Sequence, residues 1–153
     1  MHSIDELNAL NSTVDTIIVD NNACNEQSFT VLDLTRFANL RVFEVGSHSL
    51  YYVAEVKLIG LSKLESVVIG KNSFTENRNA HLVTGNPNHH FYLKNCEKLR
   101  ELKIGPFSFN EYSVIEITNV NSLEVIEIGE YDESSNNFKY SSLELKSNTQ
   151  IMK

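Results

Sequence analysis

The stretch Leu99-Arg-Glu-Leu-Lys-Ile-Gly105 has close copies elsewhere in the chain, and the spacing of these copies decides the fold. Two copies match it well, Leu64-Glu-Ser-Val-Val-Ile-Gly70 and Leu123-Glu-Val-Ile-Glu-Ile-Gly129. Looser copies begin at Val14 and Leu40, so the leading apolar residues of the five copies are 26, 24, 35 and 24 positions apart. A period of about 24 residues with fixed apolar positions is typical of a solenoid, in which each repeat forms one coil.

Each repeat also contains a shorter phrase in which apolar and polar residues alternate, such as Phe91-Tyr-Leu93 or Ile115-Glu-Ile117. Alternation with period two predicts a strand with one buried face. The connections between the phrases are too short in the regular coils for an ordinary helix. The sequence therefore predicts a mainly β, right-handed solenoid of about five coils with two short parallel strands per coil, forming one domain over residues 1–153.

Equivalent residues of successive coils should lie side by side in such sheets. The repeated apolar positions are expected to form the core, in columns such as Ile17/Phe43/Val67/Leu102/Ile126 and Val19/Val45/Ile69/Ile104/Ile128. Three further columns are informative. One column alternates strictly in charge, and a second contains no adjacent like charges, as expected if neighbouring rungs attract each other. A third column is glycine, which permits either a positive φ or a close approach between backbones. The three columns are Arg41/Glu65/Arg100/Glu124, Ile18/Glu44/Val68/Lys103/Glu127 and Gly46/Gly70/Gly105/Gly129.

The two ends of the repeat array differ. Ser3-Ile-Asp-Glu6 fits a capping box and is followed by apolar residues at helical spacing, which predicts a short N-terminal helix that shields the first coil. No comparable cap is evident after Leu145. An uncovered sheet edge can template pairing with another chain, so self-association through the C-terminal edge is a second hypothesis.

An insert of eleven residues interrupts the period and predicts a loop over residues 75–90. It contains His81, His89 and His90, which are potential zinc or copper ligands. Adjacent histidines point in opposite directions in an extended chain, and no cysteine or well-spaced acid completes a ligand set. A solvated loop without a metal is the preferred interpretation. The acidic stretch from Glu124 to Glu133 lacks the ligand spacing of a calcium loop, so it is interpreted as a solvated face.

Composition and the absence of known motifs narrow the classes of function that this protein could have. A formal net charge of −7 disfavours binding to nucleic acid and to anionic membranes. No apolar run is long enough to insert into a membrane, and the first residues do not resemble a signal peptide. Cys24 and Cys96 fall at apolar core positions about three repeats apart, so a disulfide between them is not expected. Free cysteines are typical of reducing compartments, and we therefore expect a cytoplasmic location. No catalytic or phosphate-binding motif occurs, which predicts a non-enzymatic protein without a cofactor.

The segment Leu64–Phe74 fits the template L-x-x-L-x-L-x-x-N-x-L, and roughly residues 10–146 resemble a leucine-rich repeat protein. The recurrent Ile-Gly-x-x-Ser-Phe phrase is similar to the bacterial-surface-antigen subtype, which is also abundant in protists. The template asparagine is replaced by His48, Phe107 and Tyr131 in other copies, so a parallel β-helix-like coil is the alternative architecture. The resemblance implies a scaffold that binds proteins, usually on its concave face.

The leading functional hypothesis is therefore a non-enzymatic protein–protein interaction module of leucine-rich-repeat type. The alternative is a structural or self-assembling segment of a longer repeat protein. Under the leading hypothesis the contact surface consists of exposed column residues, two tyrosines and the insert loop, because exposed tyrosines are frequent at interfaces. The partner-binding residues predicted in this way are Arg41, Glu44, Tyr51, Tyr52, Val68, Arg100, Lys103 and Glu127.

Overall fold

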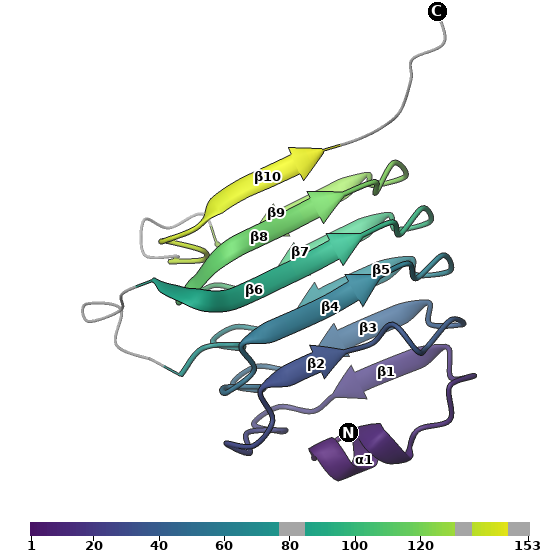
Figure 1. Ribbon diagram of the computed structural model, residues 1–153, viewed down its shortest axis with the longest axis horizontal. Helices are drawn as coiled ribbons and strands as arrows, with labels where there is room; N and C mark the ends of the chain where they lie inside the picture. The colour runs from purple at the N-terminus through teal and green to yellow at the C-terminus, as the bar shows by residue number, and fades with distance from the viewer. Residues whose placement is uncertain (77–84, 131–135, 147–153) are drawn as a thin grey trace, which may run out of the picture.

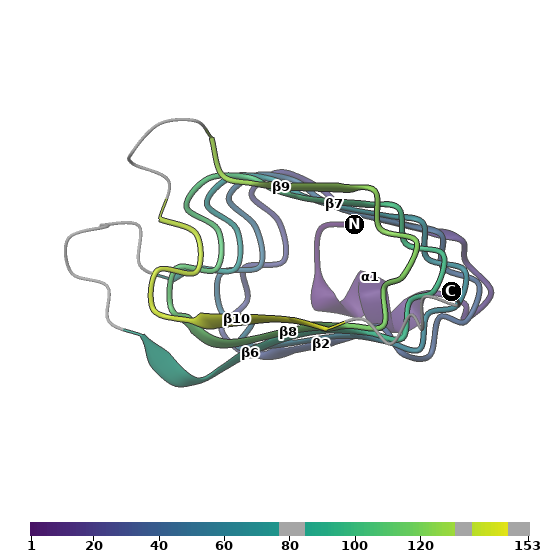
Figure 2. The ribbon, with the colours of Figure 1, turned by 90° about the horizontal axis from the view of Figure 1, so that it is seen from above.

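The computed structural model describes residues 1–76, 85–130 and 136–146 and consists of two parallel sheets that face each other (Figures 1 and 2). Sheet A has the order β1-β3-β5-β7-β9 and sheet B the order β10-β8-β6-β4-β2. The strands of sheet A are β1 (Thr16–Val19), β3 (Val42–Val45), β5 (Ser66–Ile69), β7 (Glu101–Ile104) and β9 (Val125–Ile128). Those of sheet B are β2 (Val31–Asp33), β4 (Glu55–Ile59), β6 (Asn86–Lys94), β8 (Tyr112–Thr118) and β10 (Ser142–Lys146).

Consecutive strands alternate between the two sheets, so the chain winds as a solenoid of about four turns. Viewed from above, with the C-terminal coil nearest the viewer, the chain runs counterclockwise along sheet A and back along sheet B (Figure 2). This path is right-handed, the hand that parallel crossover connections almost always take. The mainly β solenoid with two parallel strands per coil is confirmed.

The strand register matches the columns read from the sequence. Phe43 pairs with Val67, Val67 with Leu102, and Leu102 with Ile126 in sheet A. The side chains of alternate residues point between the two sheets and form the core, where Phe43, Val67 and Leu102 have no exposed surface. Each coil therefore buries its apolar residues against the coils on either side as well as against the opposite sheet.

A column of large apolar side chains occupies the corner that follows sheet A. Leu50, Phe74, Phe109 and Phe138 all have a positive φ, between 52° and 61°, which is rare for bulky residues. The rings of Phe74 and Phe109 stack 4.5 Å apart, and those of Phe109 and Phe138 stack 5.1 Å apart. This stacking and the bond from Phe109 N–H to the Ser73 carbonyl (3.1 Å) hold the corner in a conformation that costs about 1–3 kcal/mol per residue.

Buried serines precede Leu50, Phe74 and Phe109 in this column and connect the coils. The Ser73 hydroxyl donates to the Gly46 carbonyl at 2.8 Å and accepts a bond from the Ser49 backbone N–H at 3.3 Å. Ser108 repeats this arrangement one coil later, with its hydroxyl 2.7 Å from the Gly70 carbonyl and 3.0 Å from the Ser73 nitrogen. This serine ladder satisfies backbone groups at the corner that would otherwise be buried without partners.

Replacing Ser73 by alanine is expected to lower the free energy of unfolding by about 1–3 kcal/mol, because the Gly46 carbonyl and the Ser49 N–H lose a buried partner. Urea unfolding followed by circular dichroism measures the change. Ser62→Ala is the matched control, since Ser62 is exposed, and it should leave the midpoint nearly unchanged. Equal midpoints for the two variants would contradict a stabilising role of the ladder.

The glycine column closes the strands of sheet A by close approach between coils. A Cβ atom on Gly70 would lie 2.6 Å from the Ser47 backbone nitrogen, and one on Gly105 would lie 2.7 Å from the Gly70 carbonyl carbon. Gly129 has a positive φ of 77°, while Gly46, Gly70 and Gly105 do not. Of the two predicted reasons for glycine, the lack of space applies at the inner coils and the backbone conformation applies at Gly129.

The predicted loop over 75–90 is wrong for its last residues. Residues Asn86–His90 belong to β6, where Asn86 pairs with Tyr112 and His90 with Val114 across a bulge. The end of the insert joins sheet B because its backbone pairs with the start of β8. Residues 77–84, including His81, lie outside the described residues.

The predicted N-terminal helix forms as α1 (Ile4–Ala9) and lies across the N-terminal end of the solenoid (Figures 1 and 2). The Ser3 hydroxyl accepts a bond from Glu6 N–H, as expected for an N-cap. Leu7 is buried against the first coil. The Arg36 guanidinium donates to the carbonyls of Leu7 and Leu10, at 2.8 and 3.2 Å, and so satisfies the C-terminal end of α1.

Candidate interaction surfaces

Six of the eight predicted contact residues lie along the outer face of sheet A, on neighbouring rungs. Glu44 pairs with Val68, Val68 with Lys103, and Lys103 with Glu127 in the ladder. Arg41 and Arg100 are exposed and stand one residue before the start of β3 and β7. The structure therefore brings Arg41, Glu44, Val68, Arg100, Lys103 and Glu127 together on one surface, which we call the sheet A face.

The three basic residues of this face are paired with glutamates of sheet A or beside it. Arg41 binds Glu65 through two hydrogen bonds of 3.1 and 3.2 Å, and Arg100 binds Glu124 in the same way at 3.2 and 3.1 Å. The bond with Arg41 lowers the pKa of the Glu65 carboxyl and raises the pKa of the arginine. Lys103 binds Glu101 at 2.6 Å. The alternating column thus forms two Arg–Glu pairs across adjacent coils.

Tyr51 and Tyr52 do not join the sheet A face. They lie half-buried at the corner between β3 and β4, where the Tyr51 backbone N–H donates to the Asn25 side chain at 3.0 Å. Their aromatic character was the only sequence signal for an interface. The structure places them away from the other six predicted residues because the corner follows, rather than belongs to, the strand.

The histidines of β6 have structural neighbours. His89 is buried against the edge of the Tyr112 ring, with centroids 5.3 Å apart, and burial lowers its pKa. The His90 Nε2–H donates to the Pro87 carbonyl at 2.8 Å, and the His90 Nδ1 lies 2.9 Å from the Tyr92 hydroxyl. Within the described residues, no group of three or more His, Cys, Asp or Glu side chains is arranged to hold a metal ion.

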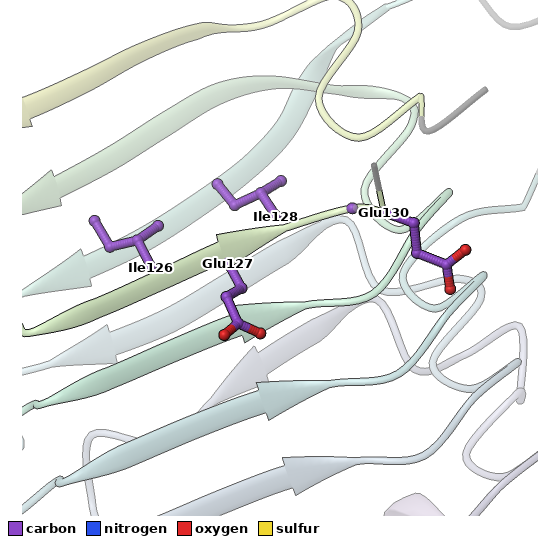
Figure 3. A pocket seen from close by; sticks show the side chains of 5 residues that line it. Ile126, Glu127, Ile128 and Glu130 are labelled. Carbon is purple, nitrogen blue, oxygen red and sulfur yellow. The ribbon is translucent and has the colours of Figure 1, made fainter. Parts of the chain in front are cut away.

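The second candidate surface is the outer edge of β9, which we call the C-terminal edge. The sequence predicts Ile126 and Ile128 as core residues, but they are 46% and 38% exposed. This prediction is wrong because no strand among the described residues pairs with that side of β9. Ile126 and Ile128 project together on one side of the strand, and Glu127 projects on the other (Figure 3).

The C-terminal edge combines this apolar surface with exposed glutamate side chains, whose partners Arg100 and Lys103 lie on the inner side of β9. A hollow of about 550 Å³ is lined by residues 126–130. Glu124 and Glu127 form the last rungs of the two charged columns, and their side chains remain 60% and 63% exposed. Sequence reasoning identified the edge from the missing cap but did not identify its isoleucines, because the repeat pattern assigns them to the same columns as buried residues.

Comparison with known proteins adds no relative: no protein-family model, curated protein or solved structure matches this chain. Among the described residues, no helix has the length and apolar character needed to cross a membrane.

Proposed function

We propose that this chain is a non-enzymatic protein-interaction module of leucine-rich-repeat type, and that the C-terminal edge is its main binding surface. The observation that supports this most directly is the exposure of Ile126 and Ile128 in columns whose inner members, such as Leu102 and Ile104, are buried. Large apolar side chains at a strand edge that no described strand covers are suited to strand addition, in which a partner's strand extends the sheet.

The sheet A face is the second surface in this proposal. A hollow of about 250 Å³ lies on it between Ile18, Glu44 and Val68. Ile18 is 48% exposed, so this part of the face offers apolar contact. The Arg41–Glu65 pair in the same coils is already satisfied within the chain, which leaves it less to contribute to a partner.

A pull-down from the native cell extract, comparing two variants with matched chemistry, tests the proposal. The edge variant carries Ile126→Asn and Ile128→Asn, and the face variant carries Ile18→Asn and Val68→Asn. Captured proteins should be lost with the edge variant and retained with the face variant, provided that both variants melt cooperatively in circular dichroism. Loss with the face variant alone would assign binding to the sheet A face, and identical capture by all three proteins would contradict both surfaces.

The alternative function, a self-assembling structural segment, is favoured by the same uncovered edge. Light scattering coupled to gel filtration over a wide concentration range distinguishes it. A mass that rises with concentration in the unmodified chain, and stays at 17.4 kDa in the edge variant, would support self-assembly. A constant monomer mass would support the interaction module.

The two cysteines bear on location. Cys24 and Cys96 are free and buried, and burial raises the pKa of both thiols to about 11. They are therefore poorly reactive, and we propose a reducing compartment, the cytoplasm, because secreted proteins more often use their cysteines in disulfides.

A further inference from the structure

We propose that the C-terminal edge recognises a partner strand that runs parallel to β9 and has the pattern apolar-basic-x-apolar-basic-apolar. This inference rests on the proposed function, because it specifies the chemistry of the partner that the edge binds. The inference follows from the contacts that β9 makes with β7, the strand that pairs with it on its inner side.

The inner neighbour, β7, is the template for the partner. Leu102 pairs with Ile126 and Ile104 with Ile128, so apolar side chains meet on the core side of the sheet. On the outer side, Arg100 binds Glu124 through two hydrogen bonds, and Lys103 lies 4.0 Å from Glu127. The segment that pairs with β9 on its inner edge thus has basic residues at two positions and apolar residues at three.

The glutamates at the outer edge of β9 favour basic residues in an added strand as well. Among the described residues, both charged columns of sheet A end on a glutamate, and both glutamate side chains are more than half exposed. A strand added beyond β9 would place its side chains directly opposite Glu124 and Glu127. Opposite charges across a strand pair are favourable and like charges are unfavourable, so lysine or arginine at both positions completes the columns.

The apolar requirement is equally specific. Ile126 and Ile128 project together into the hollow at the edge (Figure 3), at the spacing of alternate residues in a strand. Two apolar residues of the partner, separated by one basic residue, would cover them. The segment Leu99-Arg-Glu-Leu-Lys-Ile104 of this chain has this pattern, so a peptide with its sequence is a natural probe.

A second copy of the chain fits the edge less well. The opposite end of the solenoid is covered by α1, and the backbone carbonyls of Met1 and His2 accept bonds from Asp20 and Cys24 beside β1. Head-to-tail stacking is therefore obstructed. Tail-to-tail pairing would bring two acidic edges together, since Glu124, Glu127 and Glu130 would be present on both copies.

The test uses the full chain and a fluorescent peptide of residues 98–105, Lys-Leu-Arg-Glu-Leu-Lys-Ile-Gly, with binding followed by anisotropy. We expect saturable binding that weakens as salt is added. A control peptide carrying R100E and K103E keeps every apolar residue and should bind about tenfold more weakly. The edge variant I126N/I128N should not bind the basic peptide, although it remains folded by circular dichroism.

A charge exchange tests the register. The protein variant E127K should prefer a peptide carrying K103E to the unmodified peptide, which is expected only if the added strand places residue 103 opposite residue 127. Equal binding of the basic and acidic peptides would overturn the proposed chemistry while leaving the interaction module intact, as judged by the pull-down. Absence of peptide binding, with self-association that the edge variant abolishes, would overturn it in favour of a second copy.

Discussion

Replacing Phe109 by alanine is expected to lower the free energy of unfolding by about 3–5 kcal/mol, the usual range for a large aromatic residue removed from a core. Phe109 has no exposed surface and stacks between Phe74 and Phe138. It also meets the edges of the Phe91 and Tyr112 rings, with centroids 5.2 and 4.9 Å away. The substitution therefore leaves a cavity at the point where the corner column meets sheet B.

Phe109→Leu is the control for this variant. Leu50 occupies the equivalent corner with a φ of 58° and is fully buried, so leucine is compatible with the backbone there. Phe109→Leu should cost clearly less than Phe109→Ala in urea unfolding. Similar losses for both variants would indicate that the aromatic ring contacts, rather than the volume of the side chain, determine stability at this corner.

Replacing Leu102 by alanine is expected to destabilise the fold by about 2–5 kcal/mol, because Leu102 is fully buried between Val67 and Ile126. Ile126→Ala is an internal control in the same column. Its side chain is nearly half exposed, so the loss should be a small part of that for Leu102→Ala, measured by the same unfolding experiment.

A large loss for Ile126→Ala would show that the C-terminal edge is covered in solution. The unfolding data would then argue against strand addition at this edge before any partner is known. A change below about half a kcal/mol for Leu102→Ala would instead contradict burial of the column itself.

The architecture could be predicted from the sequence because the same pattern of apolar and polar residues recurs in every coil. The spacing of Leu64, Leu99 and Leu123 predicted which residues pair between coils, and the observed register agrees at Val67, Leu102 and Ile126. The alternating charges of Arg41, Glu65, Arg100 and Glu124 likewise predicted neighbours that the structure joins in two Arg–Glu pairs. The N-terminal helix followed from a local capping signal.

The candidate site was predicted only in part. Sequence periodicity treats all members of a column as equivalent, so it could not distinguish buried Leu102 from exposed Ile126. It also grouped Tyr51 and Tyr52 with the contact residues on aromatic character alone, whereas their place at a corner separates them from the sheet A face. Exposure depends on which coils lie above and below, and that is a property of the assembled solenoid.

The sequence by itself determined the coil, the columns and the helix at the first end, since each depends on residues whose spacing is visible along the chain. Tertiary structure decided the rest. Phenylalanine is held at a positive φ because stacking in the next coil offsets the local cost. Asn86 joins a strand because β8 offers it a partner, and Ile126 is exposed because the described residues place no strand beyond β9. These three features depend on contacts between coils, which the sequence of a single repeat does not encode.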